Sequence, residues 1–202
     1  MAELVVERGY AAVTVTDVVA RARVSKRTFY EQFAEREDCF LATYEALAEE
    51  PLRRITEAAG VAAAQSLGLR EQVERATGAY LEAMAEQPGL TRALLTQIAS
   101  VGPRGRAVRR EVLRRFADQL LVLAQEAHRL RFGVAPLTRP LALALVGGIN
   151  ELVLDALEGA EGEEIADGIE GAVAELARTV ADLVVAVLTR EGAAVSPGPR
   201  SG

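Results

Sequence analysis

Hydrophobic positions recur at three- and four-residue spacings along most of the chain, which is the period of an amphipathic helix. Glycine and proline divide this pattern into separate blocks. No stretch of four or more residues alternates convincingly between apolar and polar positions as a half-buried strand does. We therefore predict an all-α fold. The expected helices span roughly 2–8, 15–21, 26–33, 69–86, 89–99, 104–131, 136–158 and 163–190, with a further long helix starting at Glu37.

The first thirty residues carry explicit signals for helix ends. Gly9 follows the first predicted helix and suits a left-handed carboxy-terminal cap. Thr14 and Asp17 have the spacing of a capping box, in which each side chain bonds the backbone N–H of the other residue. Ser25 can cap the next helix. Two short helices joined by residues 22–24 match the helix-turn-helix pattern.

The second helix of this motif has two chemically different faces. Phe29 and Phe33 lie four residues apart and form an apolar stripe. The apolar residues that face this stripe from the first helix and the turn are Val15, Val18, Val19, Ala22 and Val24. The residues left to point outward or sideways are Lys26, Arg27, Thr28, Tyr30 and Gln32. These polar side chains can bond base edges or phosphates.

Composition and charge narrow the class of protein. The chain has 202 residues, 50% of them hydrophobic and 4% aromatic, which suits a helical protein with a sizeable core. A net charge of −6 argues against a general nucleic-acid coat protein. The charge is uneven, because the segment from Arg21 to Tyr30 holds four bases and no acid. The sequence therefore fits a small basic reading head on an acidic body.

Taken in register, these signals resemble the tetracycline-repressor (TetR) family of regulators. The matching positions are Gly9-Tyr10, Thr14-Val15, Asp17-Val18, Ala22, Val24-Ser25, Thr28-Phe29-Tyr30, Phe33 and Arg36-Glu37-Asp38. The resemblance covers about residues 9–40, and the rest of the chain agrees only in length and helical pattern. It implies a ligand-responsive transcriptional regulator, a repressor that binds a palindromic double-stranded DNA operator as a dimer.

The resemblance also implies roles for single residues. Those expected to contact DNA at or near the start of the first motif helix are Thr14 and Thr16. Those at the amino end of the recognition helix, which meets the bases in such motifs, are Ser25, Lys26, Arg27 and Thr28. Tyr30 and Arg36 are expected to contact phosphates. Phe29, Phe33 and Tyr10 are expected in the core.

Two departures from the family pattern support an alternative function. Arg23 occupies a turn position that is usually glycine, where a positive φ would strain a larger residue. The first helix is also a turn or two shorter than in most family members. The alternative is a dimeric helical module that binds a ligand or a protein but not DNA.

The remaining chain divides by composition. We expect a helix-turn-helix domain at 1–46, with the motif at 14–33, a ligand-binding and dimerisation domain at 47–192, and a disordered tail at 193–202. The helices near 136–158 and 163–190 carry long apolar stripes and predict a homodimer through a four-helix bundle. Alternatively, they close the core of one chain.

Two features bear on the path of the chain. Pro51 should kink or break the helix that starts at Glu37. The most apolar window is 140–157, but Asn150, Glu151 and Asp155 interrupt it. A membrane span needs about 20 apolar residues, so we expect a buried helix and a protein without a membrane partner. The single cysteine, Cys39, allows no internal disulfide, and from this we expect a cytoplasmic location.

The ligand site is less sharply defined by sequence. Pockets are mostly apolar with a few placed polar groups, which predicts a small lipophilic or aromatic effector. The candidate ligand-binding residues are Tyr80, Met84, Gln97, His128 and Asn150. Each can also be read as core or surface, and Asn150 could equally bridge the dimer.

An enzyme is not expected. One histidine and one cysteine cannot build most metal sites, and no glycine-rich phosphate loop appears, so we predict no cofactor and no metal. Cys39 should be buried and inert. A second basic cluster comprises Arg104, Arg106, Arg109, Arg110, Arg114 and Arg115. It could touch the DNA backbone or pair with acids such as Glu45, Glu49 or Glu50.

Overall fold

The computed structural model describes residues 1–130, 132–159 and 165–190. For residues 159 and 165–172 only the backbone is described. Within these ranges the chain is helical and contains no strand. The predicted tail at 193–202 lies outside the described residues. The helices are α1 (Ala2–Arg8), α2 (Val15–Ala22), α3 (Lys26–Gln32), α4 (Arg36–Ala64), α5 (Leu69–Ala85), α6 (Pro88–Gln97), α7 (Gly102–Arg129), α8 (Arg139–Gly159) and α9 (Ile165–Thr189), with 3₁₀ turns η1 (Tyr10–Ala12) and η2 (Ile98–Val101).

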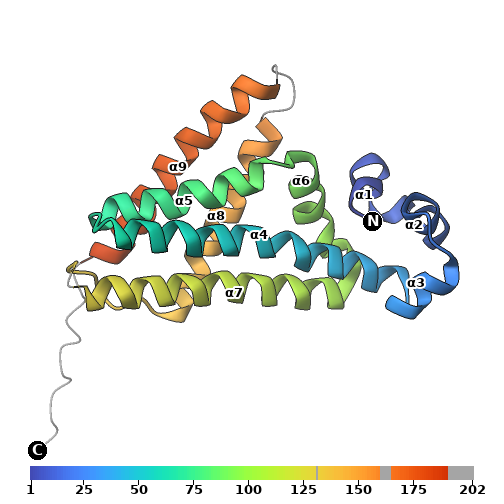
Figure 1. The fold of residues 1–202 in the computed structure, drawn as a ribbon, viewed down its shortest axis with the longest axis horizontal. Helices are drawn as coiled ribbons and strands as arrows, with labels where there is room; N and C mark the ends of the chain where they lie inside the picture. Colours follow the sequence, from blue (N-terminus) through green and yellow to red (C-terminus); the bar gives the residue numbers. More distant parts are fainter. Residues whose placement is uncertain (131, 160–164, 191–202) are drawn as a thin grey trace, which may run out of the picture.

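Two long helices set the shape of the molecule. Figure 1 shows α4 and α7 running side by side along its length, with α1, α2 and α3 grouped at one end. The other end is built from α5, which packs on α4, and from α8 and α9, which pack on α7 and α5. The three amino-terminal helices therefore form a head on a helical body.

One buried cluster joins this head to the body. It contains Leu4 and Val5 from α1, Phe29 from α3, Phe40 from α4 and Ile98 from η2. Tyr10 packs its ring on Phe40 with 4.4 Å between centroids. Because the head shares a core with α4, α6 and α7, it is not tethered through a single linker. The predicted boundary at residue 46 falls inside α4 and stays a prediction.

Two local expectations about the backbone were wrong. Gly9 has the expected positive φ of 75°, but its ψ of 151° lies outside the left-handed helical region. The chain there passes directly into η1, whose Tyr10 is buried. Of the kink or break expected at Pro51, the break is wrong, since α4 continues from Arg36 to Ala64 with Pro51 buried inside it, and the kink stays a prediction. Packing against α5 and α7 outweighs the local cost of proline, about 3 kcal/mol.

The apolar helix α8 is not buried within one chain. By length and composition Arg139–Glu158 could cross a membrane, yet only 22% of its most apolar window is covered by the rest of the described chain. The expected burial is therefore not provided by a single subunit. A Cβ added at Gly147 or Gly148 would meet no atom within 4 Å, so the glycine pair also faces open space.

Candidate functional site

The helix-turn-helix is shaped by its own capping residues. The Thr14 hydroxyl accepts from the Asp17 N–H at 3.2 Å, and the Asp17 carboxylate accepts from the Thr14 N–H at 2.9 Å. The predicted capping box is thus confirmed. These bonds hold the pKa of the Asp17 carboxyl below its usual value. The Ser25 hydroxyl accepts from the Thr28 N–H at 3.0 Å and starts α3 as expected.

The turn between the two helices depends on a strained residue. Arg23 has φ 55° and ψ 41°, the left-handed conformation that glycine adopts without cost. Its N–H donates to the Ala20 carbonyl, and the Val24 N–H donates to the Val19 carbonyl at 3.1 Å. Two hydrogen bonds therefore hold the arginine in place.

Replacing Arg23 with glycine should stabilise the protein by about 0.5–1 kcal/mol, because glycine removes the strain of the left-handed conformation. The measurement is the free energy of unfolding in urea for both proteins. A matched substitution at the exposed Ala20, which lies inside α2, should instead destabilise by about 1 kcal/mol. Equal effects of Arg23→Gly and Ala20→Gly would contradict this reading of the turn.

Helix α3 places one aromatic residue inward and its polar residues outward. Phe29 is only 4% exposed and stacks at a tilt on Phe33 with centroids 5.4 Å apart. Tyr30 is 55% exposed and meets the edge of Phe29. The other exposed residues of α3 and the start of α2 are Thr14, Thr16, Lys26, Arg27, Thr28, Glu31, Gln32 and the cap Ser25. A buried aromatic anchor thus presents a polar helix to solvent.

Ion pairs neutralise part of the positive charge that the sequence places on the helix-turn-helix. Arg21 pairs with Glu3 at 2.6 Å and with Glu7 at 2.8 Å, so α1 neutralises it. Arg27 pairs with Glu31 at 3.0 Å, although its side chain is 89% exposed. Among the described residues, neither Arg23 nor Lys26 has an ion-pair partner. The free positive charge is therefore concentrated at the turn and the start of α3.

Arg36 makes different contacts from the phosphate contact that the sequence predicted. Its guanidinium donates to the carbonyl oxygens of Tyr10 at 3.1 Å and Ala11 at 3.4 Å, and to that of Val13. It also lies 4.2 Å from the centre of the Tyr10 ring. This geometry directs Arg36 into the head, where it satisfies the backbone of η1 and the loop after it.

Gln97 was expected in the ligand site but lies at the junction of head and body. Its side-chain oxygen accepts from the Tyr10 N–H. Gln97 ends α6, and η2 follows it and packs on α7 at Gly105, where an added Cβ would lie 2.1 Å from the Ile98 carbonyl oxygen. Only glycine allows this approach. The turn between α6 and α7 is therefore fixed against α7 and bonded to the head.

The second basic cluster pairs largely with acids. Arg104 contacts Glu35 at 2.7 Å, Glu37 at 3.1 Å and also Asp38, all at the start of α4. Hydrogen bonding to Arg104 lowers the pKa of the Asp38 carboxyl. Arg115 pairs with Glu49 at 2.7 Å, one of the acids named from the sequence.

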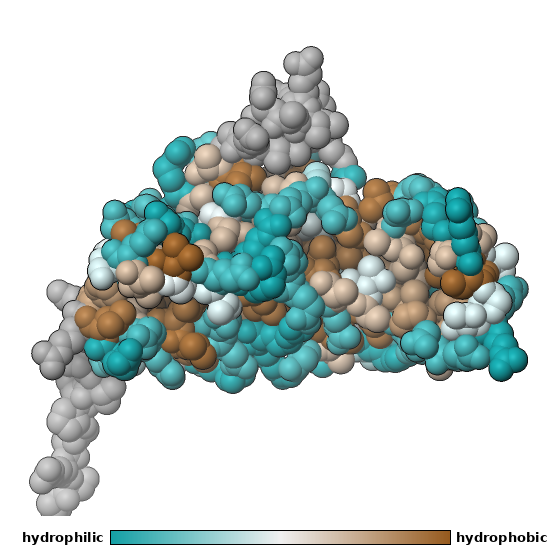
Figure 2. Space-filling model, in the orientation of Figure 1, coloured by the Kyte–Doolittle hydropathy of each residue, from teal (hydrophilic) through white to brown (hydrophobic). Residues whose placement is uncertain are grey.

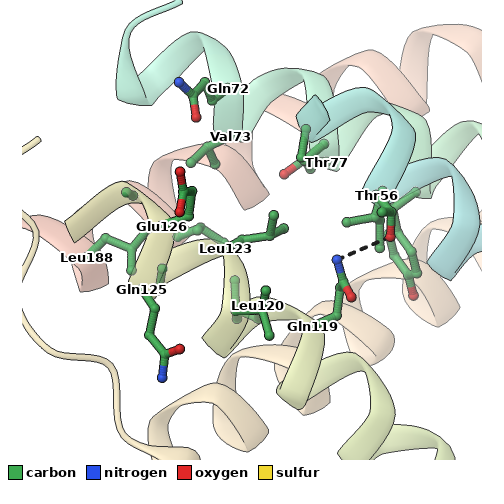
Figure 3. Close-up of a pocket in the computed structure, with 18 of the residues that line it drawn as sticks. Thr56, Gln72, Val73, Thr77, Gln119, Leu120, Leu123, Gln125, Glu126 and Leu188 are labelled. Carbon is green, nitrogen blue, oxygen red and sulfur yellow. Dashed lines mark hydrogen bonds between the residues drawn. The ribbon is translucent and has the colours of Figure 1, made fainter. Parts of the chain in front are cut away.

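A cavity of about 570 Å³ opens in the body, between α4, α5 and α7, with α8 and α9 closing its far side. Most of its lining is apolar, including Ile55, Val73 and Leu120. Figure 3 shows the polar exceptions among these side chains, and they include Thr56, Gln72, Thr77, Gln119 and Glu126. Apolar residues also reach the surface over this end of the body in Figure 2. The size and chemistry suit a small organic ligand.

The five candidate ligand residues fall in different places. Tyr80 lines the cavity, and its hydroxyl donates to Asn150 at 2.8 Å, while burial raises the pKa of the phenol. Asn150 therefore does not line the cavity itself but bonds a residue that does. Met84 is buried in the core, and the exposed His128 bonds the Val134 carbonyl at 3.0 Å, so neither lines the cavity.

Sequence reasoning missed the polar lining residues. Thr56, Thr77 and Gln119 come from three helices, and none stands out from the neighbouring helical pattern. Cys39 is buried, and burial raises the pKa of its thiol, in line with an inert residue. Within the described residues, no group of three or more metal-ligating side chains comes together.

Comparison with known proteins identifies the amino-terminal domain. Residues 2–43 match the family model of bacterial regulatory proteins, tetR family. The amino-terminal domain of this chain is a tetR-family domain. That match covers α1, α2, α3 and the start of α4, the segment whose caps and core were described above. The search of curated proteins found no match to this sequence.

Solved tetR-like structures share the fold of the whole chain. The regulator FadR from Bacillus subtilis, solved in complex with stearoyl-CoA, is 17% identical, with a TM-score of 0.73 over 93% of this chain and 95% of that one. FadR from Bacillus halodurans is 17% identical, with a TM-score of 0.73 over 94% and 93%. A tetR-family protein from Rhodococcus RHA1 is 17% identical, with a TM-score of 0.66 over 94% and 93%. At such identities the likeness shows the fold.

Proposed function

We propose that this chain is a dimeric, ligand-responsive transcription repressor that binds a palindromic DNA site through α3. The observation that carries the proposal is the exposed polar face of α3, held in place by the buried Phe29 and by two side-chain caps. Residues of this kind bond base edges and phosphates in the major groove. Such a protein acts on chromosomal DNA, and we place it in the cytoplasm.

The proposed DNA contacts follow from exposure and chemistry. Lys26 is an exposed cation without an ion-pair partner in the described chain, and Arg27 and Tyr30 extend from the same helix. Thr16 presents a hydroxyl at the start of α2, and the Thr28 hydroxyl bonds that of Ser25 at 3.0 Å at the start of α3. The Thr14 and Ser25 hydroxyls cap the two helices. We no longer include Arg36, because its guanidinium is engaged inside the head.

The proposed repressor is a dimer, in which a second copy of the chain supplies the second recognition helix and covers the apolar face of α8. A helix-turn-helix protein needs two recognition helices about 34–36 Å apart to meet successive turns of DNA. The uncovered apolar surface of α8, its glycine pair and the exposed Leu183 of α9 support dimerisation through α8 and α9. Four helices from two subunits would bury these residues.

Replacing Leu183 with arginine should convert the protein to a monomer, because a charge would be buried in the proposed interface. Light scattering should give a mass of two 21.5 kDa chains for the unmodified protein and of one for the variant. Val61→Arg is the control, since Val61 is similarly exposed but lies on α4. An unchanged dimer in Leu183→Arg, or a monomeric parent protein, would contradict this interface.

The effector is proposed to be a lipophilic small molecule in the cavity of the body. The apolar lining supports this, and the Bacillus subtilis FadR of the same fold was solved with stearoyl-CoA. The cavity touches α4 and α7, and the opposite ends of these helices hold the head through Arg36 and Arg104. A ligand that shifts either helix would change the separation of the two heads and release DNA.

The test is a mobility-shift measurement with the promoters that flank the gene. We expect a complex whose affinity falls steeply with salt and which a cell extract of lipophilic compounds dissociates. Binding without any response to lipophilic compounds would remove the effector but leave the DNA-binding role. No complex at low salt would favour the helical binding module that does not bind DNA.

A further inference from the structure

Thr77 differs from the other threonines that lie inside the long helices. Threonine in a helix usually satisfies its hydroxyl by donating to the carbonyl one turn earlier. Here Thr43 donates to Cys39, Thr56 to Leu52, Thr96 to Arg92, Thr179 to Glu175 and Thr189 to Val185. Among the described residues, none accepts a hydrogen bond from the Thr77 hydroxyl or donates one to it.

The Thr77 hydroxyl stays open to the cavity although most of the residue is buried, because its oxygen is not among the fully buried polar atoms that lack a partner in the described chain. The residue is only 8% exposed and lines the cavity from α5. Figure 3 shows its oxygen directed toward the space between α5 and the leucines of α7. A hydroxyl that faces an apolar cavity and has no protein partner can bond water or a ligand there, and an apolar ligand that displaced the water would leave it unsatisfied at a cost in free energy. A ligand atom inside the cavity would supply the missing partner.

Of the other polar residues of the lining, Gln125 is exposed at the surface, and those that face the cavity are engaged with protein partners. Gln119 donates to the Thr56 hydroxyl at 3.2 Å, and Gln72 donates to the Leu67 carbonyl at 2.8 Å. The charged lining residues are Glu126 and Arg129, which bond each other at 2.6 Å and at 2.9 Å. The described lining thus offers no free cation to an anion and no free carboxylate to a cation.

We propose that the part of the effector held in this cavity is uncharged and carries an oxygen within its apolar body that accepts a hydrogen bond from Thr77. This inference rests on the proposed ligand-binding function and names the chemical class that the site takes. A ketone, an ester or an ether oxygen meets the requirement. A plain hydrocarbon chain leaves the hydroxyl unsatisfied, and a carboxylate would be buried without a counter-charge.

The test uses displacement of an uncharged dye, N-phenylnaphthylamine, from the full chain by three compounds of similar size. These are dicyclohexyl ketone, dicyclohexylmethane and dicyclohexylacetate, which place a carbonyl, a methylene and a carboxylate in comparable apolar bodies. We expect the ketone to bind the unmodified protein and the carboxylate to compete poorly. Tighter binding of the carboxylate than of the ketone would overturn the uncharged class.

Thr77→Val should weaken ketone binding about tenfold and leave dicyclohexylmethane binding within about twofold, since valine keeps the shape and removes the hydroxyl. Thr77→Ser should bind the ketone nearly as the unmodified protein does. Unchanged ketone binding in Thr77→Val, or an equal loss for ketone and hydrocarbon, would overturn the role of Thr77 while the proposed function stands. Failure of the dye and of all three compounds to bind the unmodified protein would overturn the proposed effector site together with the role of Thr77, while the DNA-binding role would stand.

Discussion

Gly105→Ala is expected to destabilise the protein by about 3 kcal/mol and to weaken DNA binding together with it. The added methyl group would lie 2.1 Å from the Ile98 carbonyl oxygen and 2.9 Å from the Val101 Cβ. Backbone cannot move aside as a flexible side chain can, so η2 or α7 must shift. Because Gln97 precedes η2 and bonds the Tyr10 N–H, the shift would also loosen the head.

A second glycine provides the matched control for this prediction. Gly78 lies inside α5, and a Cβ added there would meet no atom within 4 Å. Gly78→Ala should therefore stabilise the helix by up to about 1 kcal/mol. The free energies of unfolding of both variants are measured in urea. If Gly105→Ala were as stable as Gly78→Ala, the close packing of α7 on η2 would be wrong.

Arg36→Met is expected to destabilise the protein by about 3 kcal/mol, although the residue was first identified as a DNA contact. The substitution removes charged hydrogen bonds to the carbonyls of Tyr10, Ala11 and Val13 and a cation held over the Tyr10 ring. Arg36→Lys should recover only part of this loss, because one ammonium group cannot reproduce a planar guanidinium.

Arg27→Met separates the two kinds of role. Arg27 is exposed and pairs only with Glu31 on the same helix, so its loss should change stability by no more than about 0.5 kcal/mol. It should still weaken DNA binding. Thermal unfolding and mobility shifts of both variants provide the comparison. A stable Arg36→Met protein with weak DNA binding would restore the phosphate contact predicted from the sequence.

The head could be predicted from sequence because its signals are local. The capping pair Thr14 and Asp17, the cap Ser25 and the stripe of Phe29 and Phe33 all lie within a few residues of their partners. Even the positive φ of Arg23 could be predicted, because that turn position is usually glycine. The contacts of Gln97 and Arg36 with Tyr10 span 87 and 26 residues. The spacing of apolar residues along the chain cannot predict contacts between residues so far apart.

The body was predicted in outline but not in its cavity. Its helices follow from apolar spacing, and their bounds agree closely with the structure. The cavity depends on how five helices cross, and a threonine that faces it looks the same in sequence as one that satisfies itself. The continuity of α4 through Pro51 likewise depends on neighbours that lie far along the chain.

The most direct test of the account is the affinity of α3 variants for the DNA site recovered from the flanking promoters. We expect the double substitution Lys26→Ala and Tyr30→Ala to lower specific affinity about 100-fold and to flatten the salt dependence. The protein should stay folded, with a thermal unfolding midpoint lowered only by the loss of the ring contact between Tyr30 and Phe29. Arg53→Ala, on an exposed part of α4, is the control and should bind as the parent does. Unchanged affinity in the double variant, with the DNA complex intact, would contradict recognition through α3.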